Sequence, residues 1–260
     1  MKLFQVDSFT KERFKGNPAG VCIVDGEMSD ELMQNIASEM NLSETAFVQA
    51  FSGYYKLRWF TPAVEVDLCG HATLATAHIL WEQGLAPRDK ILEFDTLSGR
   101  LKTSLSSKGI EMDFPIIPTE PVDIPDIYRD IMHSEIIAAA QVPHDLVLEL
   151  PDEDHLKNVQ PDISKIAAHS DQGVVITALS NGSPYDFISR YFVPNVGIDE
   201  DPVTGYAHCI LADYWGKKLN KSNFKAYQAS SRGGEVGVNI RGERVILIGS
   251  AVTVFESEIF

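Results

Sequence analysis

Two stretches of the chain, Arg58-Trp59-Phe60-Thr61-Pro62-Ala63-Val64 and Arg190-Tyr191-Phe192-Val193-Pro194-Asn195-Val196, share one pattern of residue types. In each stretch an arginine opens an aromatic run, a proline interrupts it and a valine closes it. Each is followed by a glycine, Gly70 or Gly205, and then by a long apolar segment. We interpret the two as copies of one strand–loop–helix unit, because a repeated order of features indicates a duplicated structure.

Continuing the alignment without a gap places Cys69 opposite Asp201. Matching Gly70 to Gly205 then requires additional residues in the second copy, and we place them at 202–204. Asp201 stands before a proline, which is also typical of a helix N-cap followed by the favoured first helical residue. A purely structural role for Asp201 therefore stays open.

The segments after the two glycines, about 70–83 and about 205–217, are apolar around most of a helical circumference, as in helices that lie inside a core. Apolar spacing also predicts a helix over Asp30–Met40, with Ser29 as its N-cap. We expect a further helix at about 125–140. The remaining segments resemble short strands: Leu3–Phe9, Gly20–Val24, Thr45–Phe51, Tyr54–Phe60, Ile91–Thr96, Ile110–Phe114, about 145–150 and a pair within 224–248.

This order of elements predicts an α+β fold of two pseudo-symmetric halves, each an antiparallel or mixed sheet wrapped around one buried helix. The length of 260 residues is enough for two domains of ordinary size. The Pro-rich stretch 115–125 marks the boundary, so we assign 1–116 to the N-terminal half and 117–249 to the C-terminal half.

The net charge of −15 argues against partners with phosphate backbones or anionic lipid surfaces, so we expect neither nucleic acid nor membrane binding. The amino terminus lacks the basic start and apolar run of a signal peptide. The three cysteines include no Cys-x-x-Cys pair, which disfavours a disulfide framework or a zinc site. We therefore expect a soluble, cytoplasmic protein with reduced thiols.

The starts of the two apolar helices are candidate ligand sites. A helix amino terminus exposes unpaired N–H groups that bind anions, and Gly70 and Gly205 would let a ligand approach the backbone closely. Two such termini facing each other would form a cradle for a carboxylate. Tight turns alone would also explain both glycines, so the two readings stay open.

Histidines near the first helix start do not suggest a metal site. His71 and His78 are seven residues apart and would share one helix face, but no third ligand is evident. A lone histidine such as His71 is more often a hydrogen-bonded structural residue than a catalyst. We therefore expect no bound metal.

Glu44 lies between the predicted helix that ends near Met40 and the strand that starts near Thr45. A carboxylate at such a junction can face a cleft, and exclusion of water would raise its pKa into the range that suits general acid–base catalysis. An ordinary exposed loop glutamate explains the position equally simply, and the residues alone favour that interpretation.

Four groups of residues, in this order along nearly the whole chain, resemble the PhzF-like family, which comprises the phenazine-biosynthesis isomerases and their relatives. The groups are Val6-Asp7-Ser8-Phe9 with Gly16-Asn17-Pro18-Ala19, Ser43-Glu44-Thr45-Ala46-Phe47, Arg58-Trp59-Phe60-Thr61-Pro62 with Glu65-Val66-Asp67-Leu68-Cys69-Gly70-His71-Ala72-Thr73, and Glu200-Asp201-Pro202-Val203-Thr204-Gly205-Tyr206-Ala207-His208. Each group alone is moderately specific, whereas the ordered set is highly specific.

The resemblance implies the fold of diaminopimelate epimerase, in which two similar halves flank the active site. The final strand of that fold returns to the first half, so about 250–260 would join 1–116. Those epimerases use two opposed cysteines; Cys69 matches the first, and Asp201 stands in place of the second. The resemblance also implies a homodimer.

Carried over position by position, the resemblance implies that Glu44 is the general acid/base and that His71 and Asp201 orient the substrate. Most relatives have a small serine where this chain has Tyr206, so we expect the tyrosine to restrict the pocket and change the substrate. Further substrate-binding positions implied by the matching motifs are Asn17, Ser43, Gly70, Thr204 and Gly205.

We therefore predict a cofactor-independent isomerase that moves a proton between carbons of a small carboxylate-bearing metabolite, with Glu44 as the proton carrier. A racemase or epimerase that uses Cys69 is one alternative. A non-catalytic small-molecule binding protein is another, and it would not exchange substrate protons with solvent.

Overall fold

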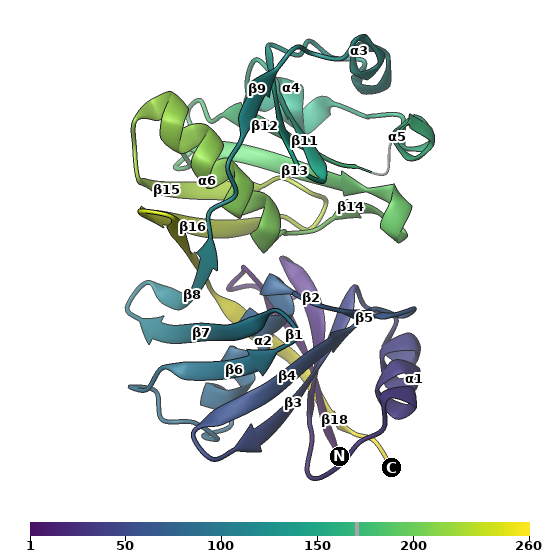
Figure 1. The fold of residues 1–260 in the computed structure, drawn as a ribbon, viewed down its shortest axis with the longest axis vertical. Helices are drawn as coiled ribbons and strands as arrows, with labels where there is room; N and C mark the ends of the chain where they lie inside the picture. Colours follow the sequence, from purple (N-terminus) through teal and green to yellow (C-terminus); the bar gives the residue numbers. More distant parts are fainter. Residues whose placement is uncertain (170–171) are drawn as a thin grey trace. The chain divides into compact units, whose positions relative to one another are not determined.

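The computed structural model describes residues 1–169 and 172–260, and it divides into two compact units (Figure 1). Unit 1 comprises Met1–Phe114 and Leu247–Phe260, and unit 2 comprises Pro115–Ile246. The chain thus leaves unit 1 at Phe114 and returns at Leu247, a few residues before the expected boundaries 116/117 and 249/250. Each unit has its own sheet and its own buried helix.

The sheet of unit 1 is mixed. Strand β1 (Lys2–Ser8) lies between two antiparallel neighbours, β2 (Asn17–Ile23) and the last strand β18 (Ala251–Glu258). Strand β2 is parallel to β3 (Glu44–Phe51), which is antiparallel to β4 (Tyr54–Phe60). Strand β4 also pairs antiparallel with β5 (Glu65–Val66) and parallel with β6 (Leu92–Thr96). Strand β7 (Gly99–Ser106) is antiparallel to both β6 and β8 (Gly109–Pro115).

The sheet of unit 2 repeats this order of pairings. Strand β11 (Asp145–Glu149) is parallel to β12 (Gly173–Leu179), which is antiparallel to β13 (Phe187–Val193). The other strands of the unit are β9 (Glu120–Val122), β10 (Ala138–Val142), β14 (Ile198–Asp201), β15 (Asn223–Gln228) and β16 (Gly234–Arg241). Strand β17 (Arg244–Gly249) begins in unit 2, and the chain returns to unit 1 within it, at Leu247. Strand β13 pairs antiparallel with β14 and parallel with β15, as β4 pairs with β5 and β6, so the predicted pseudo-symmetry is confirmed.

The central helices α2 (Gly70–Glu82) and α6 (Gly205–Leu219) are the buried helices of the two units. In α2 every residue from His71 to Ala77 is buried, because strands β1, β2, β3 and β18 all contact the helix. The predicted α+β fold, with one sheet-wrapped helix in each half, is therefore confirmed. The remaining helices are α1 (Asp30–Met40), α3 (Asp126–Met132), α4 (Glu153–Asn158), α5 (Ile163–His169) and the 3-10 helix η1 (Pro194–Val196).

The helix predicted at about 125–140 is wrong in its second half. Helix α3 ends at Met132, because His133 adopts a left-handed conformation with φ of 51° and its N–H bonds back to Arg129. The alanines that follow belong to β10, which pairs with both β9 and β11. Alanine has only a weak preference for helix, and the hydrogen bonds that β10 makes to a neighbouring strand on each side outweigh that preference.

The alignment of the two copies also needs correction. Arg58 Nε and Nη2 bind both carboxylate oxygens of Glu65, seven residues on, and Arg190 makes the same two bonds to Glu200, ten residues on. The additional residues of the second copy therefore lie before Glu200, in the loop that contains η1, and not at 202–204.

The corrected alignment changes the partner of Cys69. Cys69 is the N-cap of α2 and Thr204 is the N-cap of α6, so these two residues are equivalent and Asp201 is not opposite Cys69. Asp201 ends β14 and is not a helix cap. The side chain four residues after each N-cap binds the N-cap carbonyl in both copies: Thr73 Oγ1 donates to Cys69 O at 2.6 Å, and His208 Nδ1 lies 2.8 Å from Thr204 O.

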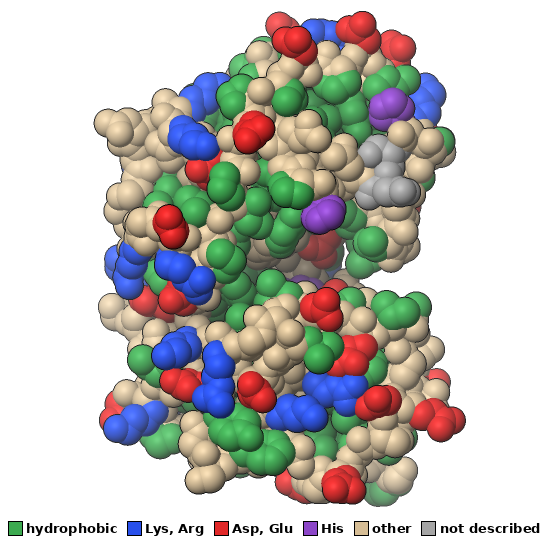
Figure 2. All heavy atoms as spheres, viewed as in Figure 1, with side chains coloured by type: hydrophobic (Ala, Val, Ile, Leu, Met, Phe, Trp, Pro, Cys, Tyr) green, Lys and Arg blue, Asp and Glu red, His purple; other side chains and the backbone are tan. Residues whose placement is uncertain are grey.

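Basic side chains on the visible face of the molecule lie beside acidic ones and form no unbroken patch (Figure 2). Over β6 and β7, for example, Glu93 contacts Arg100 at 3.0 Å and Lys102 at 3.3 Å. Within the described ranges 1–169 and 172–260, none of the helices is both long enough and apolar enough to cross a bilayer.

Candidate active site

Three side chains that the sequence singled out meet in unit 1 at the amino end of α2. Nε2 of His71 lies 3.2 Å from Oε2 of Glu44, and Sγ of Cys69 lies 3.5 Å from Nδ1 of the same ring. One ligand-type atom from each of the three residues lies within 4.8 Å of the other two. We call Glu44, Cys69 and His71 the Glu–Cys–His cluster.

The sheet and helix of unit 1 fix this cluster. Glu44 is the first residue of β3 and pairs with Ala19 of the parallel strand β2, while α2 packs against both strands. The hydroxyl of Ser8, at the end of β1, donates to the His71 carbonyl at 2.7 Å. Ser8 was missed as a site residue, although it lies in one of the matching motifs, because its contact is to backbone across 63 positions.

Burial determines the charge of the His71 ring. The side chains of His71 and Glu44 are only 8% and 15% exposed. Burial lowers the pKa of His71 to about 3, so its imidazole is neutral at pH 7. A neutral ring has one N–H donor and one nitrogen lone pair, so it can bind a donor on one side and an acceptor on the other.

The other predicted residues of unit 1 occupy the strand and helix starts around the cluster. Asn17 is fully buried, begins β2 and pairs with Ser8 of β1. Ser43 directly precedes β3 and is half-buried. Gly70 begins α2, and the Cys69 side chain makes no capping hydrogen bond, so it does not occupy the N–H groups of the first turn.

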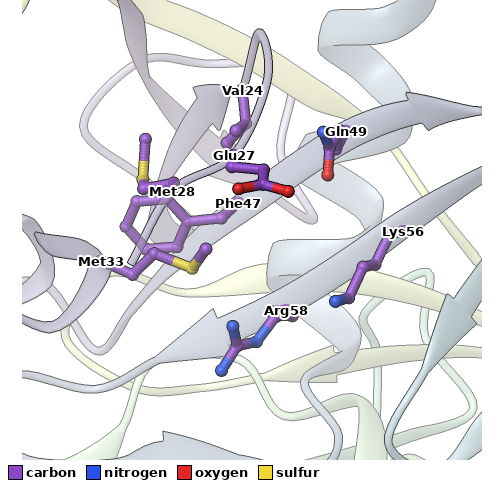
Figure 3. A pocket seen from close by; sticks show the side chains of 8 residues that line it. All are labelled: Val24, Glu27, Met28, Met33, Phe47, Gln49, Lys56 and Arg58. Carbon is purple, nitrogen blue, oxygen red and sulfur yellow. The ribbon is translucent and has the colours of Figure 1, made fainter. Parts of the chain in front are cut away.

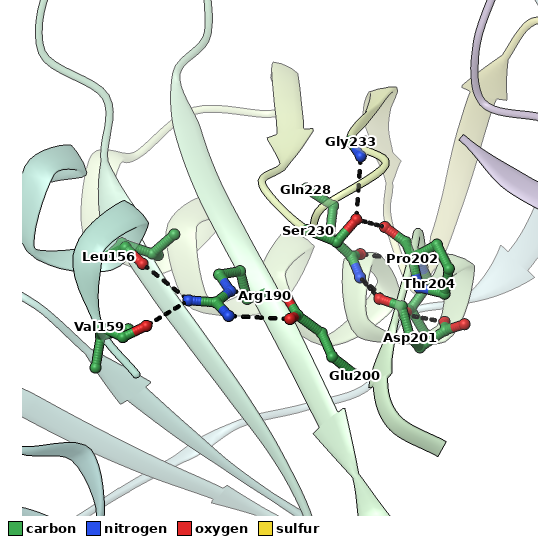
Figure 4. Close-up of polar contacts among 10 residues, drawn as sticks. All are labelled: Leu156, Val159, Arg190, Glu200, Asp201, Pro202, Thr204, Gln228, Ser230 and Gly233. Carbon is green, nitrogen blue, oxygen red and sulfur yellow. Dashed lines mark hydrogen bonds and ion pairs between the residues drawn. The ribbon is translucent and has the colours of Figure 1, made fainter. Parts of the chain in front are cut away.

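The predicted residues of unit 2 form a separate group at the start of α6 (Figure 4). The Thr204 hydroxyl donates to the Asp201 carboxylate, and the Thr204 N–H donates to Gln228 Oε1 at 2.8 Å. Gln228 Nε2 in turn donates to the Asp201 carbonyl at 2.7 Å. Asp201 and Thr204 thus act as one hydrogen-bonded unit that Gln228, a buried residue of β15 with no distinguishing sequence signal, holds together.

Tyr206, the second residue of α6 after Gly205, is bound to a residue that the sequence did not indicate. Its hydroxyl donates to Asp145 Oδ2 at 2.8 Å, and the Tyr191 hydroxyl donates to Asp145 Oδ1 at 2.7 Å. Burial and the Asp145 carboxylate raise the pKa of Tyr206, so the phenol stays protonated and donates. The ring of Tyr206 is therefore held in place by Asp145.

We expect Tyr206→Phe to lower the free energy of unfolding by about 1.5–3 kcal/mol, the range for hydrogen bonds to charged groups. The substitution removes one of two hydroxyl donors from Asp145, which is 2% exposed. Urea-induced unfolding monitored by circular dichroism measures the change. Tyr185→Phe is the control, because the hydrogen bond that it removes goes to the exposed Glu235, and the free energy of unfolding should change little. Equal effects of both substitutions would contradict the role of the Tyr206–Asp145 bond in stability.

We expect two buried histidines to make the protein less stable in acid. Burial lowers the pKa of His71 to about 3 and that of His208 to about 4, below the ordinary 6.5. The unfolded chain therefore binds protons first as the pH falls below 6.5, and stability decreases down to pH 3–4 by up to about 1.4 kcal/mol per pH unit for each histidine. Above pH 6.5 this contribution is fully present.

Urea unfolding at several pH values between about 4 and 7 tests this expectation. His71→Gln and His208→Gln should each flatten the dependence of stability on pH, whereas the exposed control His144→Gln should leave its slope unchanged. Unchanged slopes in both buried-histidine variants would show that carboxylates alone govern acid unfolding.

A separate pocket of about 230 Å³ lies where α1 approaches β3 and β4 (Figure 3). The side chains that line it include the apolar Met33 and Phe47 and the charged Glu27 and Lys56. None of the residues predicted for chemistry lines it. The Glu–Cys–His cluster, which combines burial with groups that transfer protons, is therefore the better candidate for an active site.

Comparison with known proteins shows the family to which the chain belongs. The PhzC-PhzF family model, described as phenazine biosynthesis-like protein, matches residues 6–257. The chain is 46% identical to an uncharacterized isomerase of Halalkalibacterium halodurans over 258 residues, which is 99% of this chain and 97% of the relative.

Solved structures show the same relationship. A PhzF family protein of Enterococcus faecalis superposes with a TM-score of 0.95 at 40% identity, covering 100% of this chain and 98% of the other. A probable proline racemase of Agrobacterium radiobacter has a TM-score of 0.63 at 10% identity, over 100% and 92% of the two chains, which shows a shared fold. The chain belongs to the PhzF family of phenazine biosynthesis-like proteins.

Proposed function

We propose that this protein is an isomerase that moves a proton between carbons of a small carboxylate-bearing metabolite without a cofactor. The observation that carries the proposal is the contact of Glu44 with the neutral imidazole of His71 in a buried cluster. The names of relatives, among them three uncharacterized isomerases, support the reaction class.

Glu44 carries the proton in this mechanism. The carboxylate removes a proton from one carbon, and the electron pair left behind is delocalised over the adjacent unsaturated system of the substrate. The same carboxyl group then returns the proton to another carbon, so no net proton is gained or lost. General acid–base catalysis of this kind contributes about 100- to 10,000-fold to the rate.

The amino end of α2 binds the substrate carboxylate in this proposal. The N–H groups of its first turn, beginning at Gly70, provide donors and the positive end of the helix dipole. His71 orients the Glu44 carboxylate or a polar substituent of the substrate. We further propose substrate contacts for Asn17 and Ser43, which lie at the strand starts described above.

The group in unit 2 has a different proposed role. Because the Thr204 hydroxyl is bound to the Asp201 carboxylate, a substrate amine or hydroxyl would bind the pair as a unit. Gly205 brings the α6 backbone close, and the ring of Tyr206, fixed by Asp145, limits the size of the substrate. We therefore expect a substrate smaller than the phenazine precursor.

Isotope labelling tests the proposed reaction on many candidate substrates at once. The purified protein is incubated in heavy water with a pool of small carboxylate-bearing metabolites, and mass spectrometry identifies each compound that gains one mass unit. The proposal predicts an enzyme-dependent isomeric product, which is labelled when the proton on Glu44 exchanges with solvent before it is returned. Retention of a small molecule with neither labelling nor an isomeric product would instead indicate a binding protein.

A racemase or epimerase is a second candidate, because the Cys69 thiol lies near His71 and Glu44. Such an enzyme needs a proton carrier on each face of one carbon, and its labelled product would be the stereoisomer of the substrate. Thr204 stands at the position equivalent to Cys69 and has no thiol, which favours the isomerase. The homodimer and the cytoplasmic location stay predictions; light scattering after size-exclusion chromatography tests the former.

A further inference from the structure

We propose that Glu44, Cys69 and His71 form a binding site for a thiophilic divalent cation of the zinc type. The inference goes beyond the proposed isomerase and rests on the geometry of the Glu–Cys–His cluster alone. The sequence offered no reason for it, because His71 was considered with His78, whereas its neighbours in the structure are a thiol two residues earlier and a carboxylate from another strand.

The spacing of the three groups suits one metal ion. Zinc–nitrogen bonds of about 2.0 Å and zinc–sulfur bonds of about 2.3 Å at a tetrahedral angle place the two ligand atoms about 3.5 Å apart. The Cys69 Sγ to His71 Nδ1 distance is 3.5 Å. One ligand-type atom of each residue lies within 4.8 Å of the other two. An ion bound to Sγ and Nδ1 would draw the Glu44 carboxylate away from its contact with Nε2 and complete a three-ligand site with a fourth position open.

The enclosure of the three side chains supports metal binding. The side chains of His71 and Glu44 are 8% and 15% exposed, and Cys69 is 6% exposed. Little water therefore competes with the ligand atoms for an ion.

Charge balance supports the same conclusion. A divalent cation bound to one thiolate, one carboxylate and one neutral imidazole forms a complex with no net charge. A neutral complex avoids most of the cost of burying an unpaired charge at residues as enclosed as Cys69 and His71, which are each 6% exposed. The thiolate selects zinc, cobalt and similar ions over magnesium and calcium, which prefer oxygen ligands.

Metal binding and proton transfer at this cluster exclude each other. A metal ion held by the Glu44 carboxylate occupies the group that would carry the substrate proton. The ion would therefore act as an inhibitor that links turnover to the availability of zinc, and not as a cofactor of the reaction.

Cobalt titration tests the site directly and needs no substrate. Protein treated with a chelator and reducing agent is titrated with Co²⁺, and a near-ultraviolet thiolate-to-cobalt charge-transfer band is followed. We expect one cobalt ion per chain, displacement by an equal amount of Zn²⁺, and no displacement by excess Mg²⁺. Cys69→Ser should abolish the band, and Glu44→Gln and His71→Gln should each weaken binding at least about 10-fold.

Matched controls are the substitutions Cys209→Ala and His78→Gln. Cys209 is a buried thiol of α6, and His78 lies on α2 beside Glu82, so neither change should affect the band. Glu44→Gln alters a half-buried residue without changing the shape of its side chain. The near-ultraviolet circular dichroism of this variant, recorded without metal, checks that it is folded. A band that persists in Cys69→Ser, or equal cobalt affinity of wild type and folded Glu44→Gln, would overturn the proposal, whether or not the isomerase assignment holds.

Discussion

Glu44→Gln should reduce enzyme-dependent labelling in heavy water by about 100- to 10,000-fold, the usual contribution of a general acid/base. Glutamine keeps the shape of the side chain and its capacity for a hydrogen bond to His71, but it cannot accept and return a proton. Binding of the substrate should therefore change little, and the loss should lie in kcat and not in KM. Rates of deuterium uptake into the compound identified by the pool experiment measure the effect.

The matched control is Glu31→Gln, which removes one carboxylate from the exposed first turn of α1 and should leave labelling unchanged. Cys69→Ser separates the two candidate reactions, because an isomerase that uses Glu44 does not require the thiol. Activity of Glu44→Gln within about 10-fold of wild type would refute its role as proton carrier. If Cys69→Ser lost activity while Glu44→Gln kept it, the thiol would be the base and the racemase would replace the isomerase.

The duplicated fold could be predicted because it has a sequence signature that does not depend on tertiary detail. Helices α2 and α6 are apolar around most of their circumference, as in helices that lie inside a sheet-wrapped core. The failure at 125–140 has the opposite cause. The choice between helix and strand for Ala138–Val142 depends on its partners β9 and β11, and a single-sequence pattern does not contain them.

The ion pairs Arg58–Glu65 and Arg190–Glu200 show why the alignment of the two copies was misplaced. Continuing the match without a gap as far as Cys69 and then matching Gly70 to Gly205 places the additional residues at 202–204. The structure keeps the bidentate pair and the N-cap position in both copies and accommodates the extra length in the loop around η1. Contacts, and not local residue types, decide where an insertion lies.

The candidate site was predictable only in part. Glu44 and His71 were named from motifs, but their 3.2 Å contact joins a strand start to a helix start and follows from the packing of α2 on β3. Gln228 and Asp145 had no signal, because each acts through hydrogen bonds to residues far along the chain. Long-range polar contacts of this kind depend on tertiary structure, which spacing along one sequence does not reveal.

Arg190→Met should lower the free energy of unfolding by about 3–5 kcal/mol, the range for removing one partner of a buried ion pair. The Arg190 side chain is 9% exposed. Its guanidinium group binds both oxygens of Glu200 and donates to the carbonyls of Val159 at 2.8 Å and Leu156 at 3.4 Å. Methionine fills a similar volume but leaves the carboxylate and two carbonyls without their donor (Figure 4). Urea-induced unfolding measures the decrease in the free energy of unfolding.

The equivalent substitution in the other copy, Arg58→Met, is the matched control. Arg58 makes the same bidentate pair with Glu65, but its third partner is Asp30, whose side chain is 79% exposed and returns to water when the arginine is lost. Arg58→Met should therefore lower the free energy of unfolding by less than about 3 kcal/mol. Hydrogen-exchange mass spectrometry should locate the destabilisation of Arg190→Met in peptides from unit 2. Equal losses for both arginines would show that the carbonyl contacts of Arg190 contribute nothing, and that the bidentate pair alone sets the stability of each copy.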